Sequence, residues 1–274
     1  MRTWIVGASL LIAAGAASAA DMPIVDAHIH YSEDAWGNLP PADAVKLLRD
    51  AGVKRALVSS SSDEGTQKLY EAAPDLIVPE LRPYRRRGEL SSWVRDETVI
   101  AHIESRLQRY RYVGIGEFHV YGADADLPVM RRVVQLAKQY NLFLHAHSDA
   151  DAVERLFKQD PDARILWAHS GFDRPENVAA MLRKHPRLHC DLAFRSDHAP
   201  GGQLAPEWRA VFNEFPDRFM VGTDTFVPER WHYVGEHARW SRGWLGQLPP
   251  EIAEKIGFRN GDAYFGDFPA GRGQ

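Results

Sequence analysis

The sequence predicts an α/β protein, a (β/α)8 barrel that forms a single domain from residue 21 to residue 274. Strand-like and helix-like segments alternate from residue 24 onward, which is typical of parallel strands joined by helical crossovers. Eight such repeats occur without a linker or a low-complexity insert, and this favours a closed barrel over a doubly wound open sheet. The composition, 45% hydrophobic and 26% charged, is that of a globular chain with a large core.

The first half of the chain contributes four strands. The apolar, β-branched run at 24–30 is the first, and Pro40 with Pro41 begins a helix that Gly52 ends. The remaining elements of this half are expected as strands at 53–59, 75–81 and 112–119 and as helices at 64–73 and 92–110.

The second half repeats the same order with apolar residues at helical spacing in each intervening segment. Strands are expected at 142–147, 163–169, 188–194 and 218–224. Helices are expected at 129–140, 150–159, 175–185, 206–215, 230–244 and 250–256. The last two supply the helical segment after the eighth strand, which completes the count that a closed barrel needs.

The first 20 residues predict a cleavable signal peptide. Arg2 supplies the positive start, residues 4–14 are apolar, and the small residues at 16–20 resemble a cleavage site. This apolar stretch is shorter than the roughly 20 residues that a membrane-spanning helix needs. We therefore expect a periplasmic or secreted protein that has no stable membrane insertion once the signal is removed.

Charge and cysteine content narrow the class of partner. The net charge is −4, and the only basic run is the short segment 85–87, so no nucleic-acid partner is expected. A small molecule is the expected substrate, and an oligomer is compatible with the sequence. Cys190 is the only cysteine, so it forms no internal disulfide, and its apolar surroundings predict a buried, inert thiol.

Five of the expected strands end in residues that bind metals. His28 and His30 are two positions apart on one strand, so their side chains point to the same face. The other four strand ends carry Glu117, His145 with His147, His169, and Asp224. Because the C-terminal ends of all strands meet at one face of a barrel, these side chains are expected around a common divalent cation.

The ordered set resembles the amidohydrolase superfamily, and in particular its amidohydrolase-related branch. The residues that carry the resemblance are Asp26-Ala27-His28-Ile29-His30, Glu117, His147, His169 and Asp224. It extends over essentially the whole mature chain, including the segment 252–256 and Asn260. The combination is specific for the superfamily and poorly specific for a substrate.

The resemblance implies a role for each position. His28, His30 and Asp224 would bind a first metal ion, His147 and His169 a second, and Glu117 would bridge the two. Zinc is the expected metal, with one ion or two. His145 shares a strand face with His147 and is the alternative ligand on that strand. His119 and His102 match no family position and are expected on a loop and on a helix surface.

A cation at this site would activate water for hydrolysis. Asp224 would take the proton and deliver it to the leaving group, and His169 or a second ion would polarise the substrate oxygen. The bond cleaved would belong to an amide, cyclic amide, lactone or ester. Arg82 and Arg195 follow the third and seventh strands and are candidate partners for an anionic substrate group.

Two further points stay open at this stage. The aromatic residues after Asp224 either form a lid over a ring-bearing substrate or pack the last helix on the barrel; they are Phe226, Trp231, Tyr233, Trp240 and Trp244.

Two alternatives to hydrolysis remain compatible with the sequence. One is non-oxidative decarboxylation of an aromatic acid by a bound metal, and the other is a non-catalytic barrel that only binds a metal or ligand.

Overall fold

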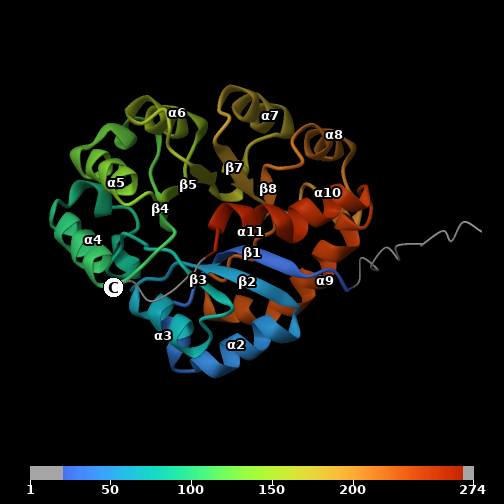
Figure 1. Cartoon of the computed structure of the whole chain (residues 1–274), viewed down its shortest axis with the longest axis horizontal. Coiled ribbons are helices and arrows are strands. Elements are labelled where there is room, and N and C mark those ends of the chain that lie inside the picture. Colours follow the sequence, from blue (N-terminus) through green and yellow to red (C-terminus); the bar gives the residue numbers. More distant parts are fainter. Residues whose placement is uncertain (1–20, 268–274) are drawn as a thin grey trace, which may run out of the picture.

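The computed structural model describes residues 21–267, and the expected signal segment 1–20 lies outside them. The strands are β1 Ile24–Ile29, β2 Val53–Val58, β3 Ile77–Pro79, β4 Gly114–His119, β5 Phe143–His147, β6 Ile165–Trp167, β7 Leu188–Asp191 and β8 Phe219–Met220. The α-helices are α1 Glu33–Trp36, α2 Pro41–Asp50, α3 Glu64–Ala72, α4 Thr98–Arg109, α5 Pro128–Gln139, α6 Ala150–Gln159, α7 Pro175–Lys184, α8 Pro206–Glu214, α9 Val234–Leu245, α10 Pro250–Glu254 and α11 Asn260–Phe265. Figure 1 shows the helices as an outer ring around the strands, with α11 lying across one end of the barrel.

The eight strands close into the predicted barrel. All named pairs are parallel, in the order β1-β2-β3 and β4-β5-β6-β7-β8. Leu81, just after β3, bridges the first group to Ile115 of β4. The seam between β8 and β1 is joined by the amide of Ala27, which donates to Val221 O at 2.8 Å, and by the amide of Asp224, which donates to His28 O at 2.7 Å.

Several strands end earlier than the sequence indicates. The segments expected at 163–169, 188–194 and 218–224 stop as strands at Trp167, Asp191 and Met220. Beyond the end of each strand the backbone enters the left-handed region, at His169, Phe194 and Asp224, whose φ angles are 55°, 52° and 58°. These three residues line the pocket at the mouth of the barrel.

The helix expected at 92–110 is also shorter. A 3₁₀ turn, Trp93–Arg95, comes first, and α4 begins only at Thr98. Asp96 between them is extended, and its Oδ1 accepts a hydrogen bond from the backbone amide of Thr98 at 3.0 Å. Asp96 therefore ends the 3₁₀ turn and caps the start of α4. Its carboxylate accepts the hydrogen bond of an amide in the first turn, which has no carbonyl acceptor within the helix.

The interior of the barrel near α11 is an apolar layer. It contains residues of six strands, Val113 just before β4, and two aromatic residues of α11, and all of them are buried: Val25, Ala27, Leu57, Val78, Val113, Phe143, Leu166, Met220, Tyr264 and Phe265. We call this set the apolar layer. Two larger clusters fill the space between the strands and the surrounding helices. The other end of the interior is polar and is described below.

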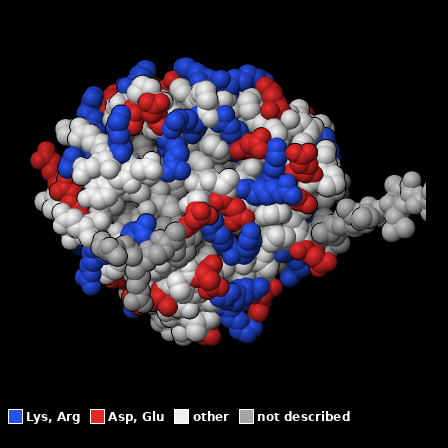
Figure 2. All heavy atoms as spheres, viewed as in Figure 1, with Lys and Arg blue, Asp and Glu red and all other residues white. Residues whose placement is uncertain are grey.

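The surface of the end covered by α11 carries charges of both signs. Figure 2 shows Lys and Arg interspersed with Asp and Glu over this face. None of the helices within residues 21–267 combines the length and the hydropathy that spanning a membrane requires.

Candidate metal centre

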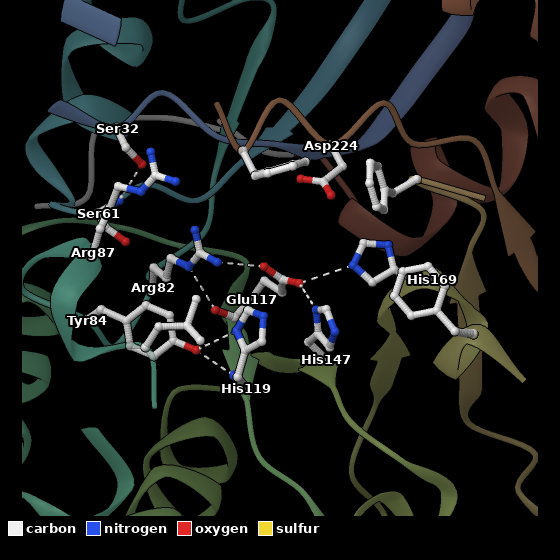
Figure 3. A pocket seen from close by; sticks show the side chains of 14 residues that line it. Ser32, Ser61, Arg82, Tyr84, Arg87, Glu117, His119, His147, His169 and Asp224 are labelled. Carbon is white, nitrogen blue, oxygen red and sulfur yellow. Dashed lines mark hydrogen bonds and ion pairs between the residues drawn. The ribbon is translucent and has the colours of Figure 1, made fainter. Parts of the chain in front are cut away.

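A cavity of about 240 Å3 opens at the C-terminal ends of the strands. Its wall is made by loops after most of the strands, and the lining residues are Ser32, Ser61, Arg82, Tyr84, Arg87, Leu90, Glu117, His119, His147, His169, Phe172, Phe194, Asp224 and Phe226. Figure 3 shows Glu117 at the centre of this pocket, between Arg82 on one side and His147 and His169 on the other.

Three buried histidines turn the same ring nitrogen toward one space. The Nδ1–H of His28 donates to Asp191 Oδ2 at 3.2 Å, that of His30 to Ser59 O at 2.5 Å, and that of His169 to Ala193 O at 2.8 Å. Carbonyl and carboxylate oxygens only accept, so each Nδ1 carries the proton in the neutral ring and each Nε2 presents a lone pair. Ligand histidines in metal proteins are oriented in this way.

The Nε2 atoms of His28 and His30 lie 3.1 Å apart. Two lone pairs at this distance repel unless a positive charge lies between or beside them. A register shift in the pairing of β1 with β2, between Asp26 and Ile29, accompanies this arrangement. Asp26 itself points to the seam, where it accepts hydrogen bonds from the amides of His28 and Thr223, each at 3.0 Å.

Glu117 connects the two pairs of histidines. Its Oε2 lies 3.3 Å from His30 Nε2 and 3.6 Å from His28 Nε2. Its Oε1 lies 2.7 Å from His147 Nδ1 and 3.4 Å from His169 Nε2. A carboxylate with one oxygen toward each pair has the geometry of a bridging ligand.

Asp224 supplies an acceptor that has no partner. Its Oδ1 is buried and makes no hydrogen bond with any residue between 21 and 267, although it lies 3.5 Å from His30 Nε2 and 3.9 Å from His28 Nε2. A buried carboxylate oxygen without a donor is costly, and a cation would compensate it. The donor set of imidazole nitrogens and carboxylate oxygens is the one that Zn²⁺ prefers. The residues of this site therefore fit a divalent metal ion.

The electrostatics of the site favour positive charge. Burial lowers the pKa of His28, but the carboxylates of Asp191, Glu117 and Asp224 outweigh it and hold the pKa well above its ordinary value. Burial and the Arg82 guanidinium lower the pKa of His30 to about 4. Although burial opposes it, nearby positive charge keeps the pKa of Glu117 well below its usual range.

Below the metal-facing atoms, three side chains form a buried polar layer with His28. His145 Nδ1 lies 3.0 Å from Glu80 Oε2, and His145 Nε2 lies 3.0 Å from Asp191 Oδ2. Burial lowers the pKa of His145, but Glu80 and Asp191 raise it to about 9, so the imidazole is charged at neutral pH. We call these four residues, His28, Glu80, His145 and Asp191, the polar layer.

The structure separates the two histidines of β5. His145 lies within the polar layer and away from the pocket, whereas His147 lines the pocket and contacts Glu117. This placement favours His147 as the ligand. His119, expected as an ordinary loop histidine, also lines the pocket, where it stacks on His147 at 4.0 Å and where its Nδ1 lies 2.9 Å from the Tyr84 hydroxyl. His102 lies on α4, as expected, but it is half-buried and its Nε2 is covered, so it is not the surface histidine that the sequence predicts.

The structure brings one of the two arginines that are candidate substrate partners to the pocket and not the other. Arg82 lines the pocket, but its Nη2 donates to Glu117 Oε2 at 2.7 Å and its Nε donates to Glu117 O at 3.1 Å. Arg195 is not brought to the pocket. Its guanidinium binds the carboxylate of Asp197 and the backbone oxygens of His169 and Asp173, so it holds the loop that carries His169.

The aromatic residues after Asp224 divide between packing and pocket. Trp231 and Trp244 are buried in the clusters between strands and helices, as the packing alternative predicts. Only Phe226 lines the pocket. Tyr233 is exposed, and Trp240 packs partly against the core.

Sequence reasoning missed Glu80 and Asp191. Both follow or end a strand, β3 and β7, as the predicted ligands do. The same criterion of an acid at a strand end would have found them. The sequence predicts that both strands run past these positions, to residues 81 and 194, so neither acid stands at an expected strand end.

The sequence matches the family model described as Amidohydrolase over residues 25–265. A barrel with this ring of histidines and acids at its mouth, matched over most of its length, belongs to the amidohydrolase family. The protein is therefore an enzyme of the amidohydrolase class. No curated protein matches the sequence.

Solved structures share the fold at low sequence identity. An uncharacterised TIM-barrel protein from Bordetella bronchiseptica has a TM-score of 0.65 and 14% identity, covering 89% of this chain and 98% of that one. A putative 2-pyrone-4,6-dicarboxylic acid hydrolase from Pseudomonas putida has a TM-score of 0.62 and 14% identity, covering 89% and 97%. A TatD family hydrolase from Entamoeba histolytica has a TM-score of 0.54 and 12% identity, covering 91% and 100%. At these identities the likeness shows the fold alone.

Proposed function

We propose that this protein is an exported, metal-dependent hydrolase that cleaves a lactone, ester, amide or cyclic amide bond of a small molecule. The observation that carries the proposal is that the Nε2 atoms of His28, His30 and His169 all lie within 3.6 Å of the Glu117 carboxylate, with Asp224 Oδ1, which has no hydrogen-bond partner among the described residues, beside the first two. A similar structure is named a hydrolase of 2-pyrone-4,6-dicarboxylic acid, which supports the lactone option.

His28, His30 and Asp224 would hold a first ion, with Glu117 Oε2 beside it. His147 and His169 would hold a second, with Glu117 Oε1 on their side. We propose zinc because the donors are nitrogen and carboxylate oxygen. When bound, a zinc ion lowers the pKa of water from about 15.7 to about 7 and polarises a carbonyl oxygen.

Asp224 is the residue that we propose moves the proton. Its Oδ1 is buried and faces the histidines without a donor, so it is available to accept a proton from water at the site. The carboxylic acid so formed then protonates the leaving group. Arg230 fixes the loop that carries this residue, because its guanidinium donates to the backbone oxygens of Asp224 and Thr223.

Arg82 has a supporting part in this proposal. Its guanidinium clamps both the backbone oxygen and the carboxylate of Glu117, which sets the position of the bridging group. Arg195, which we expected to bind substrate, is assigned no contact with it, because its nitrogens already bind the loop around His169.

The test uses the mature chain, residues 21–274, purified without chelator. Metal analysis is expected to find one or two equivalents of zinc, two if Glu117 bridges. The protein should then hydrolyse members of a panel of short esters, lactones and amides. Absence of bound metal together with absence of turnover would refute the proposal. Release of CO2 from aromatic acids without hydrolysis of the panel would replace it with the decarboxylase alternative.

Export is tested separately. The sequence features of residues 1–20 support a cleaved signal peptide and a periplasmic or secreted protein. N-terminal sequencing of the protein recovered outside the cytoplasm should begin at Ala20 or Asp21. An intact Met1 would contradict it.

A further inference from the structure

The wall of the pocket has two chemically different sides. The loops after β1, β2 and β3 contribute mostly polar lining residues, Ser32, Ser61, Arg82 and Arg87, together with Tyr84 and Leu90. The loops after β6, β7 and β8 contribute one phenylalanine each: Phe172, Phe194 and Phe226. These three rings remain 50%, 50% and 38% exposed, although most large apolar side chains of the protein are buried.

The three rings form one continuous set that is anchored at both ends. Phe172 stacks on His169, with ring centroids 4.5 Å apart and 15° between planes. Phe194 meets Phe172 edge to face at 6.3 Å and Phe226 edge to face at 5.3 Å. The guanidinium of Arg230 lies over both Phe194 and Phe226, at 4.7 Å and 5.5 Å from the ring centroids. The rings are therefore held in place beside the metal-facing atoms.

The backbone at two of these positions is unfavourable for a bulky residue. Phe172 and Phe194 have φ angles of 51° and 52°, in the left-handed region that favours glycine. Neither ring is buried, so core packing does not account for a phenylalanine there. Strain of this kind, kept at an exposed position next to a site, indicates a functional reason for the side chain.

We propose that Phe172, Phe194 and Phe226 form a clamp for a flat aromatic ring of the substrate, with the scissile bond on the side of Glu117 and Asp224. This proposal rests on the function proposed above and names its substrate class, an aryl ester, lactone or amide. The cavity, about 240 Å3, is smaller than the roughly 300–1,000 Å3 of pockets for drug-sized ligands. A substrate with a single ring system fits this size.

Binding tests the clamp without any requirement for a metal or for turnover. The probes are benzamide and cyclohexanecarboxamide, which are neutral and differ in whether the ring is flat. Their dissociation constants are measured by NMR titration of the metal-free mature chain. Benzamide is expected to bind about three- to tenfold more tightly, the range that aromatic pairing supplies. Equal affinities, or tighter binding of the cyclohexane compound, would overturn the proposal.

A glycine variant separates a role in binding from a role in stability. Phe194→Gly removes the ring and also removes the strain of a bulky residue in the left-handed region. Tm should therefore stay level or rise, while the preference for benzamide is lost. Asn141→Gly is the matched control, because Asn141 has φ 55° but does not line the pocket. It should leave the preference unchanged. A preference retained in Phe194→Gly would overturn the clamp, as would a preference lost in Asn141→Gly.

Turnover distinguishes failure of the clamp from failure of the hydrolase proposal. With the zinc-loaded protein, phenyl acetate should have a KM about three- to tenfold lower than cyclohexyl acetate, and Phe194→Gly should remove the difference. Hydrolysis of both esters with equal KM refutes the clamp and leaves the hydrolase intact. If neither ester is hydrolysed and no metal binds, the hydrolase proposal fails, and the benzamide titration still decides whether the ring site exists.

Discussion

The interior of the barrel consists of two layers that are equally buried and chemically opposite. The apolar layer, next to α11, includes Phe143 and Leu166, which are fully buried. The polar layer, next to the pocket, includes His145 and Asp191, which are also fully buried. Apolar side chains gain free energy from burial alone, whereas buried charges are tolerated only when each is paired.

The comparison teaches that the apolar end of the barrel interior should contribute to stability alone, whereas the polar end should contribute to both stability and the site. A truncation in the apolar layer leaves an empty space and no unsatisfied charge. A substitution in the polar layer leaves a charged partner without compensation, directly below the metal-facing atoms. The predictions below test this division in order of decreasing expected effect.

The largest effect is expected for Asp191→Asn, because both stability and the site depend on this carboxylate. Asp191 accepts from His28 Nδ1, His145 Nε2 and the backbone amide of His169. Breaking a buried charge pair costs about 3–5 kcal/mol of unfolding free energy. Loss of an outer partner of a ligand histidine lowers metal affinity about 10- to 100-fold. Urea unfolding measures the loss of unfolding free energy, and competition with a zinc chelator measures the loss of metal affinity.

The control for this variant is Asp75→Asn. Asp75 pairs with Arg49 on the surface, with 66% of its side chain exposed. Surface pairs contribute about 0–1 kcal/mol, so stability and zinc affinity should hardly change. Equal losses in both variants would show that the polar layer has no special role.

The main effect of Asp224→Asn should be on catalysis. Removing the proton acceptor is expected to lower kcat by about 10²–10⁴, the usual contribution of general acid–base catalysis. Zinc affinity should fall, because an amide oxygen is a weaker metal ligand than a carboxylate, so kcat is measured at saturating zinc; Tm should stay close to that of the unchanged protein, because the amide keeps the shape of the side chain. Asp173→Asn, in the loop after β6 but outside the pocket, is the control. Near-normal kcat in Asp224→Asn would remove this residue from proton transfer.

Leu166→Ala tests the opposite side of the comparison. Leu166 is fully buried in the apolar layer, and a leucine-to-alanine change at such a site costs about 2–5 kcal/mol. The midpoint of urea unfolding should fall, while kcat/KM at 25 °C should remain within about twofold. A loss of activity in folded protein would show that the two layers are coupled.

The smallest effect is a dependence of stability on pH outside both layers. Burial lowers the pKa of His198 to about 3, and neither ring nitrogen has a hydrogen-bond partner within residues 21–267. The unfolded chain, with a histidine pKa near 6.5, therefore binds more protons below that pH, and stability falls as pH falls. The slope from this group is at most about 1.4 kcal/mol per pH unit. In His198→Leu, the urea concentration at the midpoint of unfolding should change less between pH 7.5 and 5 than in the unchanged protein. An unchanged dependence of the midpoint on pH would exclude a contribution from His198.

The closed barrel could be predicted because strand-like and helix-like segments alternate along the chain. This pattern of apolar residues is local and repeats in every strand–helix unit. The sequence also placed Glu117, His147, His169 and Asp224 at one face, since any residue that ends a parallel strand reaches that face. The structure brings all of them, with His28 and His30, around one pocket.

Other features depend on contacts that a single sequence does not contain. Arg195 lies near the mouth, but its partners, the backbone oxygens of His169 and Asp173, are fixed only by the turn after β6. The left-handed backbone of Phe172 and Phe194 contradicts the local preference of phenylalanine, so no propensity predicts it. The same holds for the pairing of Glu80 with His145, 65 positions apart in the chain.

The seam between β8 and β1 determines when, during synthesis of the chain, the proposed site can be complete. His28 and Asp224 are joined there by a backbone hydrogen bond, although almost two hundred residues of synthesis separate them. A nascent or truncated polypeptide that lacks the final strand lacks Asp224 and the strand that closes the barrel around the other five proposed ligands, so we expect it neither to bind the proposed metal tightly nor to turn over substrate. Catalysis thus begins only when the last part of the chain has arrived, and premature termination yields an inert product instead of a partly active one.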